Sequence, residues 1–173
     1  MRVQLSLCLL LALTTFLPAK DLSTHPIFKH YIGAWKAAGE LKGENNNIIT
    51  ITEEWTGKID GDNAFLIEGT RTMNGDTQPF KWSITYNEGT DSFDAVLTGP
   101  DPSQTLRFET HASEATMTVD MKAVTGSGDS AITVHQTFPG DSRDVYESKV
   151  TFTNESGQTT LEGVVKNERQ KAP

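Results

Sequence analysis

Tyr31-Ile32-Gly33-Ala34-Trp35 is the stretch from which the fold can be worked out, because every later segment is predicted to close back onto it. Gly33 lies two positions before Trp35, after a short apolar run and at the start of the first expected strand. Glycine tolerates strained backbone, so the chain can pass close beneath the end of a sheet. The Trp35 indole can then plug that end, and its N–H needs a partner when buried. The motif alone also fits an ordinary first strand with a core tryptophan.

Alternation of apolar and polar residues dominates the sequence after Trp35. It is clearest over residues 80–87, 114–123 and 131–138. This period of two is typical of strands with one buried and one exposed face. Before Trp35, residues 21–30 form a short polar lead that we expect to be irregular or to form one helical turn. Since no long helical pattern follows, the sequence predicts an all-β protein.

Turn-forming residues separate the expected strands at fairly even spacing. Nine segments rich in Gly, Pro, Asn, Asp or Ser fall between residues 43 and 157, and such residues accept positive φ or pre-set a turn. Nine turns imply ten strands, which we place at 34–42, 47–57, 63–73, 79–87, 92–98, 104–111, 114–124, 130–138, 144–154 and 157–169. A long antiparallel meander hides its edges by closing into a barrel. We therefore predict a single up-and-down antiparallel meander closed into a β-barrel of about ten strands.

The first nineteen residues differ from the rest. Met1-Arg2 is a positive start, residues 5–17 are almost continuously apolar, and Pro18-Ala19 precedes the first charged pair. This pattern indicates a secretory signal peptide, and the apolar run is shorter than the roughly 20 residues of a membrane span. We expect cleavage after Ala19, export to the periplasm or the medium, and no membrane insertion afterwards.

The expected organisation is a signal peptide at 1–19, an N-terminal lead at 20–33, one barrel domain at 34–169 and a tail at 170–173. The single cysteine, Cys8, lies within the signal, so the core must hold the mature chain together without disulfides. The formal net charge of −8 argues against nucleic acid or an anionic membrane as a partner. We expect a monomer or a weak dimer.

The Gly33-x-Trp35 element ahead of ten alternating strands resembles the calycins, the superfamily of lipocalins, fatty-acid-binding proteins and their bacterial relatives. The resemblance implies a calycin-like barrel in which a late Arg or Lys packs across the opening tryptophan. Arg169, at the end of the last expected strand, stands at that place and shares the parity of the inward-facing Leu161 and Val165. The resemblance to the calycins therefore implies a structural barrel end formed by Gly33, Trp35 and Arg169.

The chain is also similar to lipocalin-like bacterial exported proteins. In these, the Gly-x-Trp strand leads into a turn like Tyr86-Asn87 and an aromatic residue such as Phe93. The likeness in pattern covers most of residues 27–169. It implies the fold, whereas chemistry does not transfer with a fold.

The inward-facing positions are mostly apolar, and barrels of this size either fill with side chains or hold one small ligand. We predict that Phe80, Trp82 and Tyr86 form an apolar wall. Room for a ligand is predicted beside four small residues, Ala37, Gly39, Ala95 and Gly163. An apolar cavity with few polar groups is the usual site for a hydrophobic small molecule. The alternative is a solid core without a cavity.

Four polar residues share the inward parity: Glu53, Arg71, Gln136 and Ser148. A buried charge must be paired or lie near water. Glu53 and Arg71, on adjacent antiparallel strands, are therefore expected to face each other or to bind the polar end of a ligand. The opposite phase of the second strand would place Glu54 inside, and a further alternative puts these residues at the barrel mouth in solvent. The predicted ligand-binding residues are Phe80, Trp82, Tyr86, Arg71, Glu53 and Gln136.

Haem binding is an alternative, because nitrobindins, a ten-stranded calycin branch, hold haem through a histidine on a late strand. His111 and His135 lie on late strands but share parity with the polar face, so we expect both to point outward. Gly128-Asp129-Ser130 and Gly140-Asp141-Ser142 lie in expected turns without the strand-to-helix elbow of a serine esterase. We predict no catalytic residue, no metal site and no cofactor.

The leading hypothesis is an exported lipocalin-like barrel that binds a small hydrophobic or amphipathic molecule in its interior. The alternative is a packed barrel that serves as a non-catalytic accessory or interaction module. An interior cavity distinguishes the two hypotheses, because the second requires a filled core.

Overall fold

The structure is a computed structural model that describes Leu22 and residues 24–44, 47–61, 64–87, 89–90, 92–123, 130–140 and 143–171. The expected signal peptide at 1–19 lies outside the described residues. Signal cleavage and export therefore stay predictions from the sequence.

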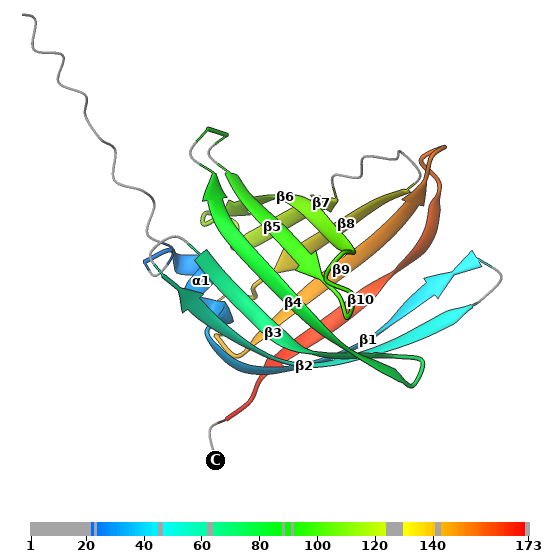
Figure 1. The fold of residues 1–173 in the computed structure, drawn as a ribbon, viewed down its shortest axis with the longest axis horizontal. Coiled ribbons are helices and arrows are strands. Elements are labelled where there is room, and N and C mark those ends of the chain that lie inside the picture. The colour runs from blue at the N-terminus through cyan, green and yellow to red at the C-terminus, as the bar shows by residue number, and fades with distance from the viewer. Residues whose placement is uncertain are drawn as a thin grey trace, which may run out of the picture.

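One short helix and ten strands follow each other along the described residues (Figure 1). Their bounds are α1 (Pro26–Tyr31), β1 (Gly33–Gly43), β2 (Ile48–Asp60), β3 (Ala64–Met73), β4 (Asp76–Asn87), β5 (Ser92–Thr98), β6 (Thr105–Ser113), β7 (Thr118–Ala123), β8 (Ser130–Thr137), β9 (Val145–Asn154) and β10 (Thr159–Arg169). The prediction of an all-β, up-and-down antiparallel meander is confirmed.

The sheet closes into a barrel because the first strand pairs with the last. Each strand pairs antiparallel with its neighbour in sequence, and β1 pairs with β10 from Trp35↔Arg169 to Gly43↔Leu161. Each of the ten described strands therefore has two neighbours, and this part of the chain leaves no strand edge unpaired to recruit another chain.

The seventh strand is shorter than the alternation predicted. It starts at Thr118 instead of residue 114, because residues 114–117 form a turn in which Met117 has a φ of 50°. The Met117 carbonyl accepts a hydrogen bond from the Phe138 amide at 3.0 Å, which holds the turn against the end of β8. Ala115 is consequently exposed.

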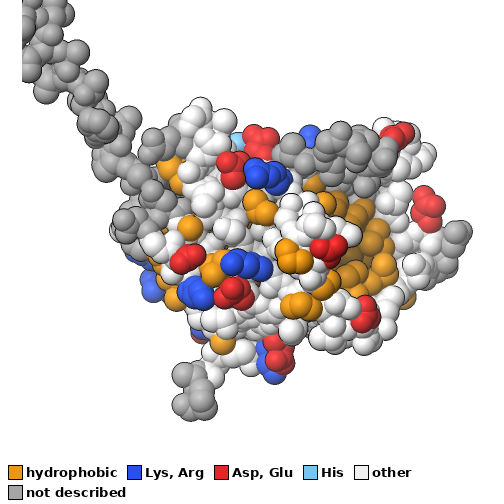
Figure 2. Space-filling view, in the orientation of Figure 1, with side chains coloured by type: hydrophobic (Ala, Val, Ile, Leu, Met, Phe, Trp, Pro, Cys, Tyr) orange, Lys and Arg blue, Asp and Glu red, His pale blue; other side chains and the backbone are white. Residues whose placement is uncertain are grey.

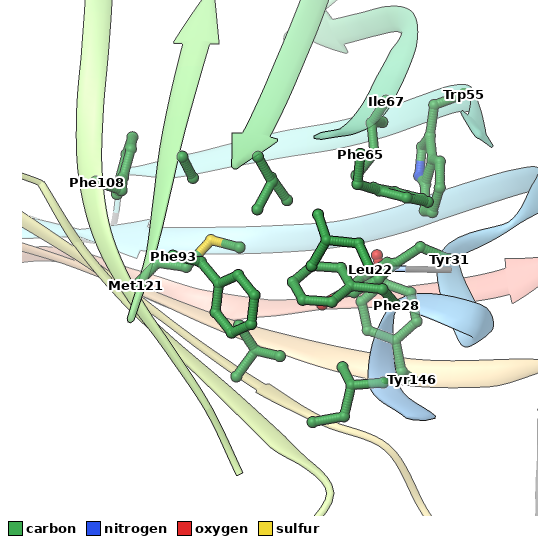
Figure 3. Packing of buried hydrophobic residues seen from close by; sticks show 14 of the residues in the cluster. Leu22, Phe28, Tyr31, Trp55, Phe65, Ile67, Phe93, Phe108, Met121 and Tyr146 are labelled. Carbon is green, nitrogen blue, oxygen red and sulfur yellow. The ribbon is translucent and has the colours of Figure 1, made fainter. Parts of the chain in front are cut away.

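The helix α1 closes one end of the barrel from inside. His25 caps it by accepting a hydrogen bond from the Ile27 amide, and Pro26 stands in its first turn. Leu22 and Phe28 are fully buried among aromatic side chains from the strands (Figure 3). The expected helical turn is therefore the plug itself, and Trp35 is one part of its surroundings. No helix in the described part of the chain is long and apolar enough to cross a membrane.

Gly33, Trp35 and Arg169 meet at this closed end. Gly33 has a φ of +112°, a backbone conformation that residues with a Cβ atom rarely adopt. The Arg169 guanidinium lies 4.5 Å from the centre of the Trp35 ring and donates hydrogen bonds to the carbonyls of His30 and Ile32. One arginine thus joins β10, β1 and the end of α1.

The prediction that Gly39 and Gly163 leave room for a ligand is wrong. A Cβ on Gly39 would lie 2.2 Å from the Val164 carbonyl oxygen, and one on Gly163 would lie 1.9 Å from that of Glu40. The space that a side chain would need is filled by backbone, because β1 and β10 approach closely at these positions.

Thr110, on β6, is fully buried, and its hydroxyl has no hydrogen-bond partner among the described residues. An unsatisfied buried hydroxyl costs about 1–3 kcal/mol. Thr110→Val, of similar shape, is therefore expected to raise the free energy of unfolding in urea by about 1 kcal/mol. The exposed Thr105→Val on the same strand should leave that energy nearly unchanged. If the Thr110→Val protein were less stable than the natural chain, this would contradict the conclusion that the Thr110 hydroxyl lacks a hydrogen-bond partner.

Candidate ligand cavity

A cavity of about 230 Å³ lies inside the barrel. Every strand contributes at least one lining side chain, and α1 contributes Tyr31. The lining is mainly aliphatic and aromatic, as the inward parity of the strands predicted. The alternative of a solid core without a cavity is therefore not what the structure shows.

Of the predicted aromatic wall, Phe80 and Trp82 line the cavity. The Trp82 ring packs on Phe108 with 5.0 Å between ring centres. Tyr86, on the same face of β4, lies nearer the closed end, where its ring contacts Phe93 at 5.4 Å and does not reach the cavity. The shared parity is correct, but parity does not say how far along the barrel a side chain lies.

Glu53 and Arg71 face each other, which was one of the two expected arrangements. They are register partners on β2 and β3, and the Arg71 Nε donates to Glu53 Oε1 at 2.5 Å. Both line the cavity, with side-chain exposures of 14% for Glu53 and 28% for Arg71. Glu54 instead points outward and pairs with Lys36 at 2.9 Å, so the phase of β2 that places Glu53 inside is the correct one.

A chain of uncharged polar groups crosses another part of the cavity wall. The Tyr31 hydroxyl donates to Gln136 Oε1, and Gln136 Nε2 donates to Ser148 Oγ at 3.2 Å. Asn167 Nδ2 also donates to Ser148 Oγ, at 3.4 Å. All four side chains are buried and line the cavity. Satisfied networks of this kind avoid the cost of burying unpaired polar groups.

Tyr31 and Asn167 are not among the predicted site residues, and neither is Ser148, although it has inward parity. Asn167 carries the same signal, since it shares parity with Val165 on β10 and both are buried. Tyr31 gives no strand signal, because it lies in α1 and reaches Gln136 across a separation of 105 residues.

The floor of the cavity is aromatic and electrically neutral. Trp55 and Tyr146 line the cavity, and Trp55 stacks on Trp35 with 5.3 Å between centres and 9° between planes. Burial raises the pKa of Tyr31 and of Tyr146, and the nearby charge of Glu53 raises the pKa of Tyr146 further. Both phenols therefore keep their protons and act as neutral groups at physiological pH.

The cavity continues toward the end of the barrel opposite α1. A hollow of about 460 Å³ at that end shares Arg71, Phe80 and Leu106 with the cavity and is bounded by residues 99–101. Figure 2 shows hydrophobic side chains gathered in a hollow on this side of the molecule. Ile48 and Met73, at this end of β2 and β3, also expose much of their apolar surface.

His111 and His135 point outward, as predicted. Both are about half exposed or more, and His135 Nδ1 lies 2.6 Å from Asp120 on the neighbouring strand. In the part of the chain that the structure describes, no group of His, Cys, Asp and Glu is placed to hold a metal ion. Of the segments Gly128-Asp129-Ser130 and Gly140-Asp141-Ser142, four residues lie outside the described part of the chain: Gly128, Asp129, Asp141 and Ser142.

No protein-family model matches this chain, and no curated protein matches it in sequence. Solved structures are similar in fold. The S-type phycobiliprotein lyase CPES from Guillardia theta is 8% identical, with 84% of this chain and 92% of that chain covered and a TM-score of 0.57. Rv2717c from M. tuberculosis is 11% identical over 85% of this chain and 99% of its own, with a TM-score of 0.55.

A protein of unknown function from the DUF3598 family of Nostoc punctiforme gives a TM-score of 0.52 at 9% identity. The match covers 82% of this chain and 48% of that one. Identities this low show a shared barrel fold and nothing about chemistry.

Proposed function

We propose that this protein is an exported, lipocalin-like barrel that binds one small hydrophobic or amphipathic molecule in its interior cavity. The observation that carries the proposal is the mainly apolar cavity with two separate polar features in its wall, the Glu53–Arg71 pair and the Tyr31–Gln136 hydrogen bond. Concave apolar sites with a few placed polar groups are the usual form of small-molecule sites.

The size of the cavity supports a small ligand. An engineered apolar cavity of roughly 150 Å³ admits benzene, and the interior space here is about 230 Å³. The hollow at the open end adds room for a ligand to extend toward solvent. Since α1 closes the opposite end, the ligand enters past Met73 and Leu106.

Two further parts of the proposal rest on the sequence. Residues 1–19 favour export, and the Arg169 contact with Trp35 supports a place among the calycins. The packed interaction module is the less favoured function, because it required a filled interior.

Native mass spectrometry of the protein purified from its own host tests the proposal. We expect a mass excess that disappears on denaturation, without a Soret absorption band. Val134→Trp should abolish the excess, because Val134 lines the cavity and the larger ring occupies the ligand space. Thr133→Trp is the matched control, since Thr133 is the exposed neighbour on the same strand.

The two variants separate ligand binding from folding. An excess that survives Val134→Trp would place the bound molecule outside the cavity. A natural protein without any excess, and without uptake of added apolar probes, would overturn the proposal in favour of the packed module.

A further inference from the structure

The cavity contains charge of both signs in equal amounts. Of the lining residues that the structure describes, Glu53 and Arg71 are the only ones with charged side chains. They form an ion pair with each other at 2.5 Å. The site therefore presents a neutral pair to a ligand, and not a free guanidinium or a free carboxylate.

The pair is held by the sheet and by packing. Glu53 and Arg71 are register partners in the β2–β3 ladder, so their backbones cannot separate without breaking the barrel. The guanidinium carbon of Arg71 also lies 4.9 Å from the centre of the Phe80 ring. At this distance, the positive charge of the guanidinium is attracted to the face of the aromatic ring. The register and the Phe80 ring therefore both place the guanidinium beside the Glu53 carboxylate.

This arrangement disfavours ligands with a net charge. An anionic head group that reaches Arg71 also lies next to the Glu53 carboxylate, and a cationic group that reaches Glu53 lies next to the guanidinium. Each ion would have to give up its hydration without gaining an unpaired opposite charge, and buried charges are costly unless they are compensated. The Glu53 carboxylate repels an anion, and the Tyr31 hydroxyl already donates its hydrogen to Gln136 Oε1.

Uncharged polar groups, in contrast, find both kinds of hydrogen-bonding partner. Among the described residues, Arg71 uses only Nε and Glu53 only Oε1 in their mutual hydrogen bond. The Nη groups of Arg71 can still donate, and Glu53 Oε2 can still accept. The Ser148 hydroxyl accepts two hydrogen bonds and keeps its own hydrogen to donate. A ligand hydroxyl or amide can both donate and accept, so it matches these groups.

We propose that the cavity selects an uncharged amphipathic molecule carrying a hydroxyl or amide group, and that Glu53 is the specificity residue that excludes anions by neutralising Arg71. This inference rests on the proposed function, because it concerns the ligand of the same cavity. In this cavity, Arg71 is one member of an ion pair without net charge and does not act as a free site for anions.

Three probes with the same ten-carbon chain test the selection at neutral pH: 1-decanol, decanoate and decylammonium. Binding to the full protein is measured by calorimetry and by the fluorescence of Trp55 and Trp82, which line the cavity. We expect decanol to bind at least about tenfold more tightly than either ion. Glu53→Gln should raise the affinity for decanoate by at least about tenfold and change that for decanol little. Arg71→Gln should favour decylammonium in the same way.

Glu54→Gln is the matched control, because Glu54 is the outward-facing neighbour with an ion pair of its own. It should bind all three probes like the natural protein. The thermal midpoint of each variant shows whether it is folded, and the comparison of the three probes on the natural protein needs no variant at all.

The possible failures are distinguishable. Equal or tighter binding of decanoate to the natural protein overturns the charge selection while the proposed function stands. The charge selection is also overturned if Glu53→Gln folds but leaves decanoate binding unchanged, or if the molecule released from the native protein is an ion. Failure of all probes together with an unchanged native mass overturns both proposals.

Discussion

Replacement of Trp35 by alanine is expected to lower the free energy of unfolding by about 3–5 kcal/mol, the range for removal of a fully buried large aromatic side chain. The Trp35 side chain is 1% exposed. It stacks on Trp55, its Nε1 donates to the Tyr31 carbonyl at 3.2 Å, and Arg169 covers its face. The substitution opens a cavity and also releases the end of α1. Urea denaturation followed by circular dichroism measures the loss.

Trp82→Ala is the matched control for this prediction. Trp82 is only partly buried and already borders empty space in the cavity, so less packing is lost on truncation. We expect its stability loss to be less than half that of Trp35→Ala. Equal losses would mean that the closed end of the barrel has no special share in its stability.

Gly163→Ala is expected to have the second largest effect, a destabilisation of about 3 kcal/mol. The new methyl group would lie 1.9 Å from the Glu40 carbonyl oxygen and 2.8 Å from the Leu41 Cα, both backbone atoms of β1. A side chain can rotate away from such a contact, but a paired strand has to move as a whole. The clash falls in the β1–β10 pairing that closes the barrel. The midpoint and the slope of urea unfolding measure the effect.

Gly99→Ala controls for the general effect of replacing glycine. A Cβ at Gly99 meets no atom within 4 Å, and Gly99 lies beyond the end of β5. Its stability should change by less than about 0.5 kcal/mol. If Gly163→Ala were as mild as Gly99→Ala, the two strands would have to be farther apart than the structure places them.

Most of the barrel could be predicted from the sequence, because the signals for strands and turns are local. The alternation at 80–87 identifies the buried face of β4, and the inward parity of Glu53 and Arg71 anticipates their contact. The predictions fail where another local rule takes precedence. Residues 114–117 continue the apolar alternation, yet the positive φ of Met117 makes them a turn. Gly39 and Gly163 suggest room for a ligand, although the neighbouring backbone occupies that room.

The candidate site was less predictable than the fold. The parity of a residue in a strand shows whether its side chain points into the barrel, but it does not show how far along the barrel axis the side chain lies. Parity therefore groups Tyr86 with Phe80 and Trp82, although Tyr86 lies nearer the closed end. The helix α1 has only a weak signal in the sequence, and its Tyr31 supplies the hydroxyl that begins the polar network.

By itself, the sequence determined the number of strands, their order and, for most of them, the face that turns inward, because a period of two and the chemistry of turns belong to short segments of chain. Only the tertiary structure decided that α1 fills one end, that a cavity remains, and that Glu53 neutralises Arg71 within it. These features depend on the register of ten strands closed upon one another. A closed register is a property of all the pairings together, so no single segment carries it.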